Sequence, residues 1–500
     1  MESNGVNLNN KEWTKKRWMP WITMVFTSFF TVSGGSYGSE VVLPVIGLRN
    51  FTLIQICICI FYAIPLILIY EMLNKSFPPN SGPKSWCESI FDPFLAVFLD
   101  VLYIFMEIGM LSSYVGVASA YIHSFSRSLK YGAFSTSGQL SISVIVFLLI
   151  IAVSLLLTYF DDYIIWMFSV VVAPLIIMVI ITFYSIPINS WRTIPDLPKR
   201  NQLDWITGLQ YVMWLNCGYE RSFSPNSKAS KGQLTNDRDF KFCLIANAIL
   251  VSILYILPLW CGCCILNHFN RDGRSFQLGN FFTFSGFLVG GNFLSSMITI
   301  SACFSSIGCI TSDVGLVSQF LIAQWYRIKN IKNYRPSFLQ ETLVSLGIVM
   351  FCSFLTLLIN QEHFAAGAST LYGFITLITV IAYLKFLWTI DSKETFPDSE
   401  FPLINNENIT KPSHILLLNS LYYSKLPLRI KQIIHSTFAI PAIFFTLVIF
   451  FTTSSILYLT IILLALFATP IFVPKYNKDH NIKNLRIESS KKFPGVLNLL

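Results

Sequence analysis

A stretch of small and polar residues interrupts the first long apolar segment of the chain. It lies between apolar runs and reads Ser33-Gly34-Gly35-Ser36-Tyr37-Gly38-Ser39-Glu40. Glycines weaken a helix interior, and a glutamate is costly to place in hydrocarbon. Broken helices at membrane depth occur where the freed backbone groups face protein or water. The residue types therefore predict a site that holds a small polar molecule near the middle of a membrane. A glycine-lined packing face is the alternative, and it explains the glycines but not Glu40.

A second polar break lies in the sixth apolar segment, in the run Met213-Trp214-Leu215-Asn216-Cys217-Gly218-Tyr219-Glu220-Arg221-Ser222. Two interrupted helices five segments apart are typical of inverted-repeat transporters, which bind substrate between the two breaks. In the alternative, Glu220 and Arg221 only mark the inner end of that segment. From the two breaks we predict these substrate-binding residues: Ser33, Gly34, Gly35, Gly38, Glu40, Asn216, Gly218, Tyr219 and Glu220.

The third apolar segment carries polar residues at intervals of seven, namely Asp100, Glu107, Tyr114 and Tyr121. Seven residues make nearly two helical turns, so these side chains share one face, which we expect to point away from lipid. Glu107 and Tyr114 join the predicted substrate site. A stripe of packed tyrosines, with Asp100 at the membrane surface, is the alternative.

The eighth segment is rich in small hydroxyl side chains and also contains an acid. Hydroxyls suit a sodium site as well as close helix packing, and the pattern does not separate the two. The candidates for ion or proton coupling are Glu40, Asp313, Ser305 and Ser306.

Acidic residues recur in or at the ends of the apolar segments, at Glu40, Glu71, Asp100, Glu107, Glu220 and Asp313. Arg221 and Lys385 are expected at inner ends, so the pattern places no Lys or Arg at membrane depth to pair with these acids. Buried acids need a compensating partner. We therefore expect a cationic substrate, an ion or a proton to supply it.

Composition defines the class of protein. The chain has 500 residues, of which 54% are hydrophobic and 12% charged, and its mean hydropathy is +0.59. These values predict an all-α polytopic membrane protein. We expect about twelve spans: 21–46, 51–73, 91–122, 140–159, 163–184, 205–224, 242–265, 287–322, 342–359, 364–387, 433–451 and 454–473.

These spans suggest a division into a transport core and two extra helices. The predicted parts are an N-terminal tail (1–18), a ten-helix core (19–388), a loop (389–432), two further spans (433–473) and a C-terminal tail (474–500). Lys and Arg concentrate in the tails and in alternate loops, which predicts that both termini are cytoplasmic. We expect a multi-pass protein of the plasma membrane, with an internal membrane as the alternative.

The net charge of +9 then reports topology, and we expect no nucleic-acid partner. Most of the 11 Cys lie in apolar segments, and the cluster Cys261-Gly262-Cys263-Cys264 has only His268 near it. We therefore expect neither a metal site nor a cofactor. No nucleophile, metal or cofactor constellation accompanies the acids, so the chain is not predicted to be an enzyme.

Four motifs in order resemble the amino acid–polyamine–organocation superfamily, and most closely its plant and protozoan polyamine and L-type amino-acid transporters. The first break is similar to that group's Gly-Gly-x-Tyr-Gly-x-Glu signature. The other three are Glu71 with Phe77-Pro78-Pro79-Asn80-Ser81-Gly82, then Phe91-Asp92-Pro93-Phe94, then Thr311-Ser312-Asp313. The resemblance departs at Met110-Leu111, and the fifth segment has no Lys.

The resemblance implies a LeuT-like inverted repeat of five plus five helices, with helices 1 and 6 discontinuous. It implies secondary active transport by alternating access, often proton-driven. Carried over by position, Glu40, Tyr114 and Glu220 would contact substrate, and Gly34, Gly35 and Gly38 would form the unwound part of helix 1.

Acids on separate helices with aromatic neighbours suit a diamine or triamine through charge pairing and cation–π contact. We therefore predict proton-coupled uptake of a putrescine or spermidine type of substrate. The first alternative is a permease or exchanger of neutral or basic amino acids, with the substrate carboxylate on the amides of Gly34 and Gly35. A non-transporting nutrient sensor is the remote alternative. Oligomeric state is left open.

Overall fold

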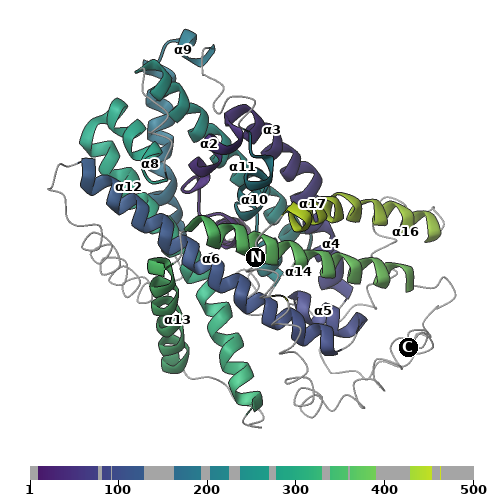
Figure 1. Ribbon diagram of the computed structural model, residues 1–500. Helices are drawn as coiled ribbons and strands as arrows, with labels where there is room; N and C mark the ends of the chain where they lie inside the picture. Colours follow the sequence, from purple (N-terminus) through teal and green to yellow (C-terminus); the bar gives the residue numbers. More distant parts are fainter. Residues whose placement is uncertain are drawn as a thin grey trace, which may run out of the picture.

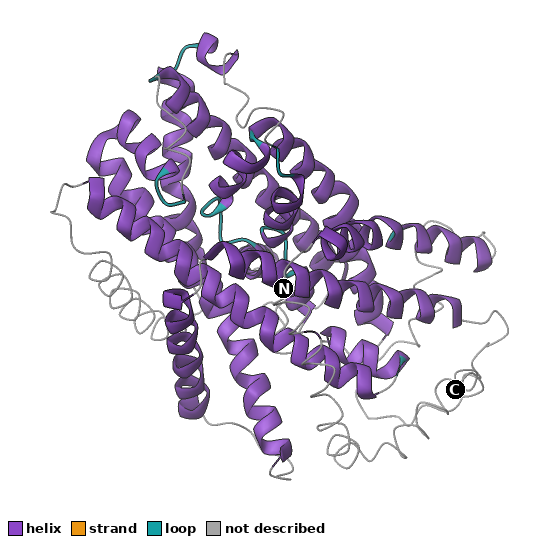
Figure 2. Ribbon diagram, viewed as in Figure 1, coloured by secondary structure: helices purple, strands orange, loops and turns teal. Residues whose placement is uncertain are grey.

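The computed structural model describes residues 9–76, 82–91, 93–128, 163–192, 203–223, 237–269, 278–328, 338–358, 361–389, 428–452 and 462. All regular elements in these ranges are helical (Figure 2). Six helices there are long and apolar enough to cross a membrane, and the stretches Trp21–Val32, Gln340–Thr356 and Gln432–Val448 form shorter apolar helices. The prediction of an all-helical membrane protein is confirmed.

The helices follow the predicted order (Figure 1). The first group is α1 (Asn9–Val32), η1 (Ser39–Val42), α2 (Leu43–Ile46), α3 (Leu48–Ile58), η2 (Cys59–Ala63), α4 (Ile64–Ser76), α5 (Gly82–Ile90) and α6 (Pro93–Ser128). The second is α8 (Tyr163–Ser185), α9 (Ile188–Arg192), α10 (Trp205–Trp214), η4 (Tyr219–Phe223) and α11 (Asp237–His268). The third is α12 (Phe281–Ile328), α13 (Phe338–Leu358), α14 (Gln361–Thr389), α16 (Leu428–Thr437) and α17 (Ala439–Thr452). The predicted spans 140–159 and 454–473 lie almost entirely outside the described residues.

Both predicted helix breaks are present. The first separates α1 from η1, and Gly34, Gly35 and Gly38 there have φ angles of 67°, 114° and 94°. The second separates α10 from η4, with Gly218 at a φ of 106°. These left-handed angles are open to glycine and strained for other residues. The glycines of the sequence pattern therefore mark where each helix unwinds.

The two breaks lie inside a bundle of long helices. α6 and α14 run side by side and diagonally across the molecule in Figure 1, and α12 packs against both α6 and α8. α1 packs on α11 and α12, while α10 packs on α14. The resulting core is continuous and includes Phe29, Tyr121 and Tyr255, none of which has any exposed surface.

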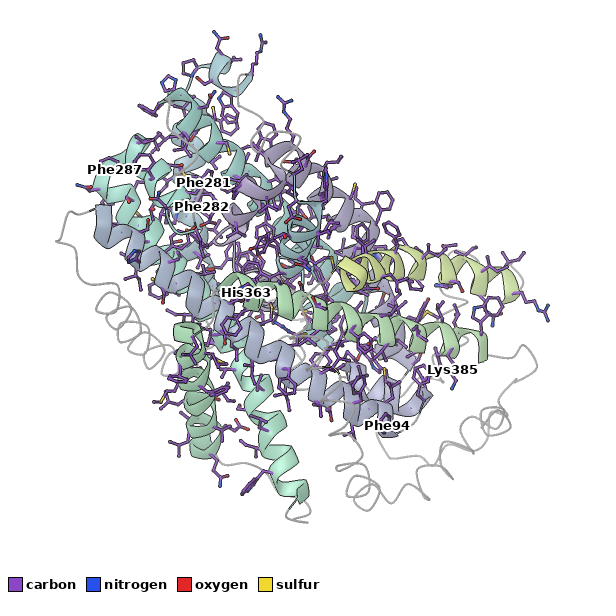
Figure 3. All side chains as sticks on the ribbon, viewed as in Figure 1. Phe94, Phe281, Phe282, Phe287, His363 and Lys385 are labelled. Carbon is purple, nitrogen blue, oxygen red and sulfur yellow. The ribbon has the colours of Figure 1, made fainter. Side chains whose placement is uncertain are left out.

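The predicted eighth span differs in its first part. α12 begins at Phe281, before the predicted start at 287, and Gly291 inside it has non-helical backbone angles. A short helical piece therefore precedes the long one. Near its start, the rings of Phe281 and Phe282 meet edge to face with centroids 4.9 Å apart (Figure 3).

Candidate substrate site

A small cavity lies between the two breaks. It encloses about 350 Å³ of empty space together with its opening, and about 20 Å³ of this admits the centre of a water molecule. That is room for roughly one water, so a larger substrate enters only after the helices move. The residues that line it are Val32, Ser33, Tyr37, Tyr114, Val117, Trp214, Leu215, Tyr255, Ser305, Ser306 and Cys309.

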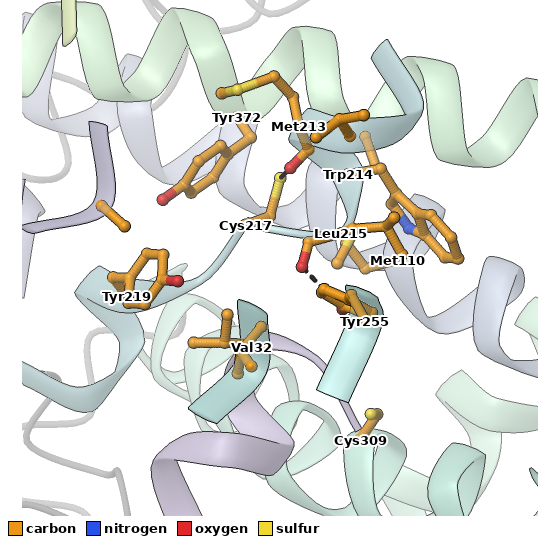
Figure 4. Packing of buried hydrophobic residues seen from close by; sticks show 14 of the residues in the cluster. Val32, Met110, Met213, Trp214, Leu215, Cys217, Tyr219, Tyr255, Cys309 and Tyr372 are labelled. Atoms are coloured by element: carbon orange, nitrogen blue, oxygen red, sulfur yellow. Dashed lines mark hydrogen bonds between the residues drawn. The ribbon is translucent and has the colours of Figure 1, made fainter. Parts of the chain in front are cut away.

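The lining comes from five parts of the chain: the first break, α6, the end of α10, α11 and α12. Figure 4 shows Val32, Leu215, Tyr255 and Cys309 from four of these parts within one close view. The lining includes four of the predicted site residues, namely Ser33, Tyr114, Ser305 and Ser306. All the lining side chains are uncharged types, and they offer hydroxyls and aromatic rings.

The first break packs closely against α12. Ser305 Oγ donates to the carbonyl oxygen of Gly34 at 2.6 Å, and a β-carbon on Gly34 would overlap Cys309 Sγ. The Gly34 amide donates to Phe29 O at 3.1 Å, and the Gly35 amide donates to Ser33 Oγ at 3.0 Å. The amides that were expected to receive a substrate carboxylate are thus bonded within the chain in this conformation.

Glu40 is fully buried and accepts three hydrogen bonds. Its donors are the Gly38 amide at 2.8 Å, the Tyr121 hydroxyl at 2.6 Å and the Gly279 amide at 3.0 Å. The carboxylate therefore ties the first break to α6 and to the turn before α12, and it does not line the cavity.

The second break is tied to α3 and α6. Asn216 and Gln55 exchange side-chain hydrogen bonds of 2.9 and 3.0 Å, and Trp214 Nε1 donates to Ser113 Oγ at 3.2 Å. Gly218 lies against the main chain of Thr31, where a β-carbon would overlap Thr31 O. The predicted residues Asn216 and Gly218 thus join the two breaks to each other and to their neighbours.

Tyr219 and Glu220 lie beyond this break, in η4, and both are buried. Tyr372 of α14 donates its hydroxyl to Glu220 Oε2 at 2.9 Å. Neither η4 residue lines the cavity. Figure 4 shows Tyr219 and Tyr372 on the side of Cys217 away from Trp214.

The expectation that the buried acids lack a protein cation is wrong. Arg221 is 2% exposed; its Nε lies 2.9 Å from Glu107 Oε1, and its Nη1 lies 2.6 Å from Asp313 Oδ2. The Arg221 side chain is long enough to reach from the end of its segment to acids on α6 and α12. Nearer the surface, Lys241 Nζ lies 3.3 Å from Glu71 Oε2.

Lys385, the other cation expected at an inner end, takes no part in this cluster. Its Nζ lies 4.8 Å from the centroid of the Phe91 ring. Figure 3 places it at the far end of α14, on the side of Phe94.

Several residues of the site could not be found from the sequence pattern. Tyr255 lies in a continuous apolar helix, yet it lines the cavity and donates to Leu215 O at 2.9 Å. Cys309 and Gln55 are likewise placed only by packing. Arg221 could have been found from the sequence. It follows Gly218 by three residues within the second helix break, and a cation at such a position is a candidate partner for buried acids.

The ends of two half-helices define the polarity of the cavity. α1 ends at Val32 and α10 ends at Trp214, so both direct their carboxyl-terminal ends, with partial negative charge, at the space between the breaks. At the end of α1 this negative charge is met by Arg221, which donates to Thr31 O, so the end of α10 is the one left to attract a positive group. The hydroxyls of Ser33 and Ser306 supply further polar contacts.

A sequence model of the amino acid permease family matches residues 22–467. The chain belongs to the amino acid permease family. The permease is accordingly an integral, multi-pass transporter of small molecules and not an enzyme, as the sequence predicted. Its superfamily resemblance is confirmed, whereas the polyamine branch stays a prediction.

No curated protein sequence matches the permease. Among solved structures it is similar to a Na⁺-coupled sialic acid symporter in a substrate-bound, outward-open state. That match has 13% identity and a TM-score of 0.47, and it covers 85% of the permease and 89% of the symporter.

Proposed function

We propose that the permease transports a neutral amino acid by alternating access, with the zwitterion bound between the two helix breaks. The observation that carries this proposal is the uncharged lining of the cavity. A zwitterion has no net charge, so its ammonium and carboxylate can be compensated by hydrogen bonds and helix dipoles instead of by a net opposite charge on the protein. A polyamine has at least two ammonium groups, and carboxylates facing the cavity would be expected for it.

The ammonium group of the substrate is placed at the carboxyl-terminal end of α10, because the end of α1 is already bonded by Arg221 through Thr31 O. The carboxylate is placed at Ser33, whose hydroxyl now accepts from the Gly35 amide. By displacing this contact, the substrate carboxylate would gain both the hydroxyl and the amide as donors. Trp214 and Tyr255 leave an aromatic surface for an apolar side chain.

Counterflow in proteoliposomes tests the substrate class. The purified full-length permease is reconstituted with unlabelled leucine inside, and uptake of labelled leucine is measured with competitors outside. We expect neutral amino acids to compete and putrescine and spermidine not to compete. Ser33→Ala should weaken leucine binding by about 1 kcal/mol, roughly fivefold, through loss of one hydrogen bond.

Ser296→Ala is the matched control, because Ser296 is half-buried on the same bundle, does not line the cavity, and its hydroxyl donates to Asn292 O. Equal loss in both variants would mean that Ser33 has no special role. Counterflow of putrescine without that of leucine would overturn the amino-acid proposal.

Polyamine transport is the second candidate, because one oxygen of Glu220, Oε1, has no hydrogen-bond donor among the described residues. A substrate ammonium could occupy that position if the cavity extended to η4. The same competition experiment decides between the two classes of substrate.

A further inference from the structure

A buried guanidinium joins four segments on one side of the cavity. Arg221 of η4 contacts Glu107 of α6 and Asp313 of α12 as described above, and its Nη1 also donates to Thr31 O of α1 at 3.2 Å. Thr31 is the penultimate residue of α1. Arg221 thus holds together the first break, the second break and the two long helices that support them.

The hydrogen bonds in this cluster are unevenly distributed. Asp313 has both oxygens bonded, since Ser312 Oγ donates to Oδ1 at 2.9 Å and Arg221 donates to Oδ2. Glu107 lies close to Arg221 Nε, but the contact is not aligned as a hydrogen bond, and its Oε2 has no donor among the described residues. Arg221 Nη2 likewise has no acceptor there. Glu107 is therefore the least firmly held acid of the cluster.

The charges in the cluster do not balance. Arg221 and Asp313 form a neutral pair, and ionised Glu107 and Glu220 would then add negative charge at sites that are 4% and 1% exposed. Buried charge without compensation is strongly unfavourable, so a carboxyl in such a place takes a proton or a cation. Glu220 has the Tyr372 hydroxyl as a donor, whereas Glu107 has no aligned donor.

A metal cation is disfavoured at this position by the groups already present. The carbonyl oxygen of Thr31 and the carboxylate of Asp313 are both bound by the Arg221 guanidinium, whose positive charge repels another cation. On α12, the hydroxyl of Ser305 already donates to Gly34 O. No group of three or more metal-ligating acids, histidines or cysteines occurs among the described residues.

We infer that Glu107 is the carboxyl that carries the coupling proton, with Arg221 as the fixed cation of the site, so that the permease is driven by protons and not by sodium. The inference rests on the proposed transport function. Proton binding converts the Glu107 carboxylate to a neutral acid and removes its attraction for Arg221. The contact of Glu107 with Arg221, which connects α6 to the end of α1, is then weakened. The contact of Asp313 with Arg221 is retained.

Tyr114 lies two turns along α6 from Glu107 and lines the cavity. Glu107 is therefore on the same face of α6 as the cavity. The titratable groups that influence Glu107 are Arg221, Glu220, Asp313, Tyr103, Tyr114, Cys217 and Cys352.

The test compares driven accumulation with exchange in proteoliposomes. Labelled leucine uptake is measured with an inward proton gradient, with an inward sodium gradient, and as counterflow without any ion gradient. For the wild type we expect accumulation with the proton gradient that a protonophore abolishes, and none with sodium alone. A lumenal pH dye should report proton entry with the substrate.

Glu107→Gln mimics the protonated acid and cannot release a proton. We expect proton-driven accumulation to fall to the level without a gradient, while counterflow persists and loses its pH dependence. Glu107→Asp keeps a titratable carboxyl, so it should retain accumulation with a displaced pH profile. Glu71→Gln is the matched control, because it removes an acid paired with Lys241 outside the cluster, and it should accumulate leucine normally.

The outcomes separate this inference from the proposed function. Accumulation by Glu107→Gln equal to wild type, or wild-type accumulation that follows sodium alone, would overturn the inference while counterflow still supported amino-acid transport. Absence of leucine counterflow in the wild type would overturn both. If gel filtration shows that Glu107→Gln is not folded, the test relies on the wild-type measurements with proton and sodium gradients and on Glu107→Asp. An unchanged pH profile of accumulation for Glu107→Asp would then contradict the role of Glu107.

Discussion

At the scale of single residues, the acids of the membrane core serve as hydrogen-bond acceptors and ion-pair partners within the protein. Glu40 receives donors from three segments, and Glu107 and Asp313 meet Arg221. The cavity itself is lined by hydroxyls, aromatic rings and the ends of two half-helices. This separation of charge from the cavity is the reason for placing a zwitterion, rather than a polycation, between the breaks.

Replacing Glu40 by Gln should both destabilise the permease and stop uptake. Glutamine has one acceptor oxygen, so its amide group must face the Gly38 or the Gly279 N–H, and one buried donor loses its partner. The expected loss is about 1–3 kcal/mol of stability, seen as a lower melting temperature of the purified protein.

Tyr121→Phe is the graded control for this variant, since it removes one donor and leaves both amide contacts of Glu40 intact. Its effect on melting should be smaller than that of Glu40→Gln. Normal leucine uptake by Glu40→Gln would show that these three contacts are dispensable for transport.

At the scale of elements, the broken helices depend on close approach between main chains. Gly34 lies against Ser305 and Cys309 of α12, and Gly218 lies against Thr31 of α1. Glycine is required at both positions because the φ angles are positive and because a β-carbon would meet another segment. The breaks are thus defined by the local sequence and held open by packing.

Gly34→Ala should therefore abolish counterflow. The substitution adds backbone strain of about 1–2 kcal/mol at a left-handed position, and the new methyl group overlaps Cys309. Leucine binding is measured on the purified protein by its effect on melting temperature, and we expect no stabilisation by leucine in the variant.

The control for this prediction is Gly315→Ala on α12. Gly315 is helical, and a β-carbon there would meet nothing within 4 Å. The variant should bind leucine like the wild type and gain up to about 1 kcal/mol of stability. If Gly34→Ala also binds leucine normally, the first break does not form the substrate site.

At the scale of the whole molecule, two sets of contacts beside the cavity keep it narrow. Glu40 ties the first break to the turn at Gly279, and Arg221 ties the end of α1 to α6 and α12. The remaining interior holds about one water. Transport in this arrangement requires each set of contacts to open in turn.

Cys309 reports on that opening, because it is a free thiol in the cavity lining and is 1% exposed. We expect small thiol reagents to modify it slowly in proteoliposomes and saturating leucine to slow the reaction further. Mass spectrometry of the peptide gives the rate, with Cys309→Ser as the control for assignment. Rapid labelling by a bulky reagent that leucine does not affect would contradict the burial of the Cys309 thiol.

The membrane class, the spans that the structure describes and the positions of both breaks could be predicted from the sequence. An apolar run of about 20 residues crosses lipid as a helix, because a helix satisfies its backbone polar groups internally. The glycines that mark the two breaks can be read directly from the sequence. The described helices α8, α11 and α14 accordingly begin and end within a few residues of the predicted spans. Ser33, Tyr114, Ser305 and Ser306 of the predicted site lie beside one cavity, and their role in substrate or ion binding stays a prediction.

Which charges meet could not be predicted without the packed structure. Arg221, Glu107 and Asp313 are far apart in the sequence, and hydropathy places Arg221 at the end of a segment without showing where its long side chain reaches. Glu40 was recognised as unusual, but its donors at Tyr121 and Gly279 come from other segments. The partners of a buried polar group are set by how helices pack, and the periodicity of one segment records only the face on which that group lies.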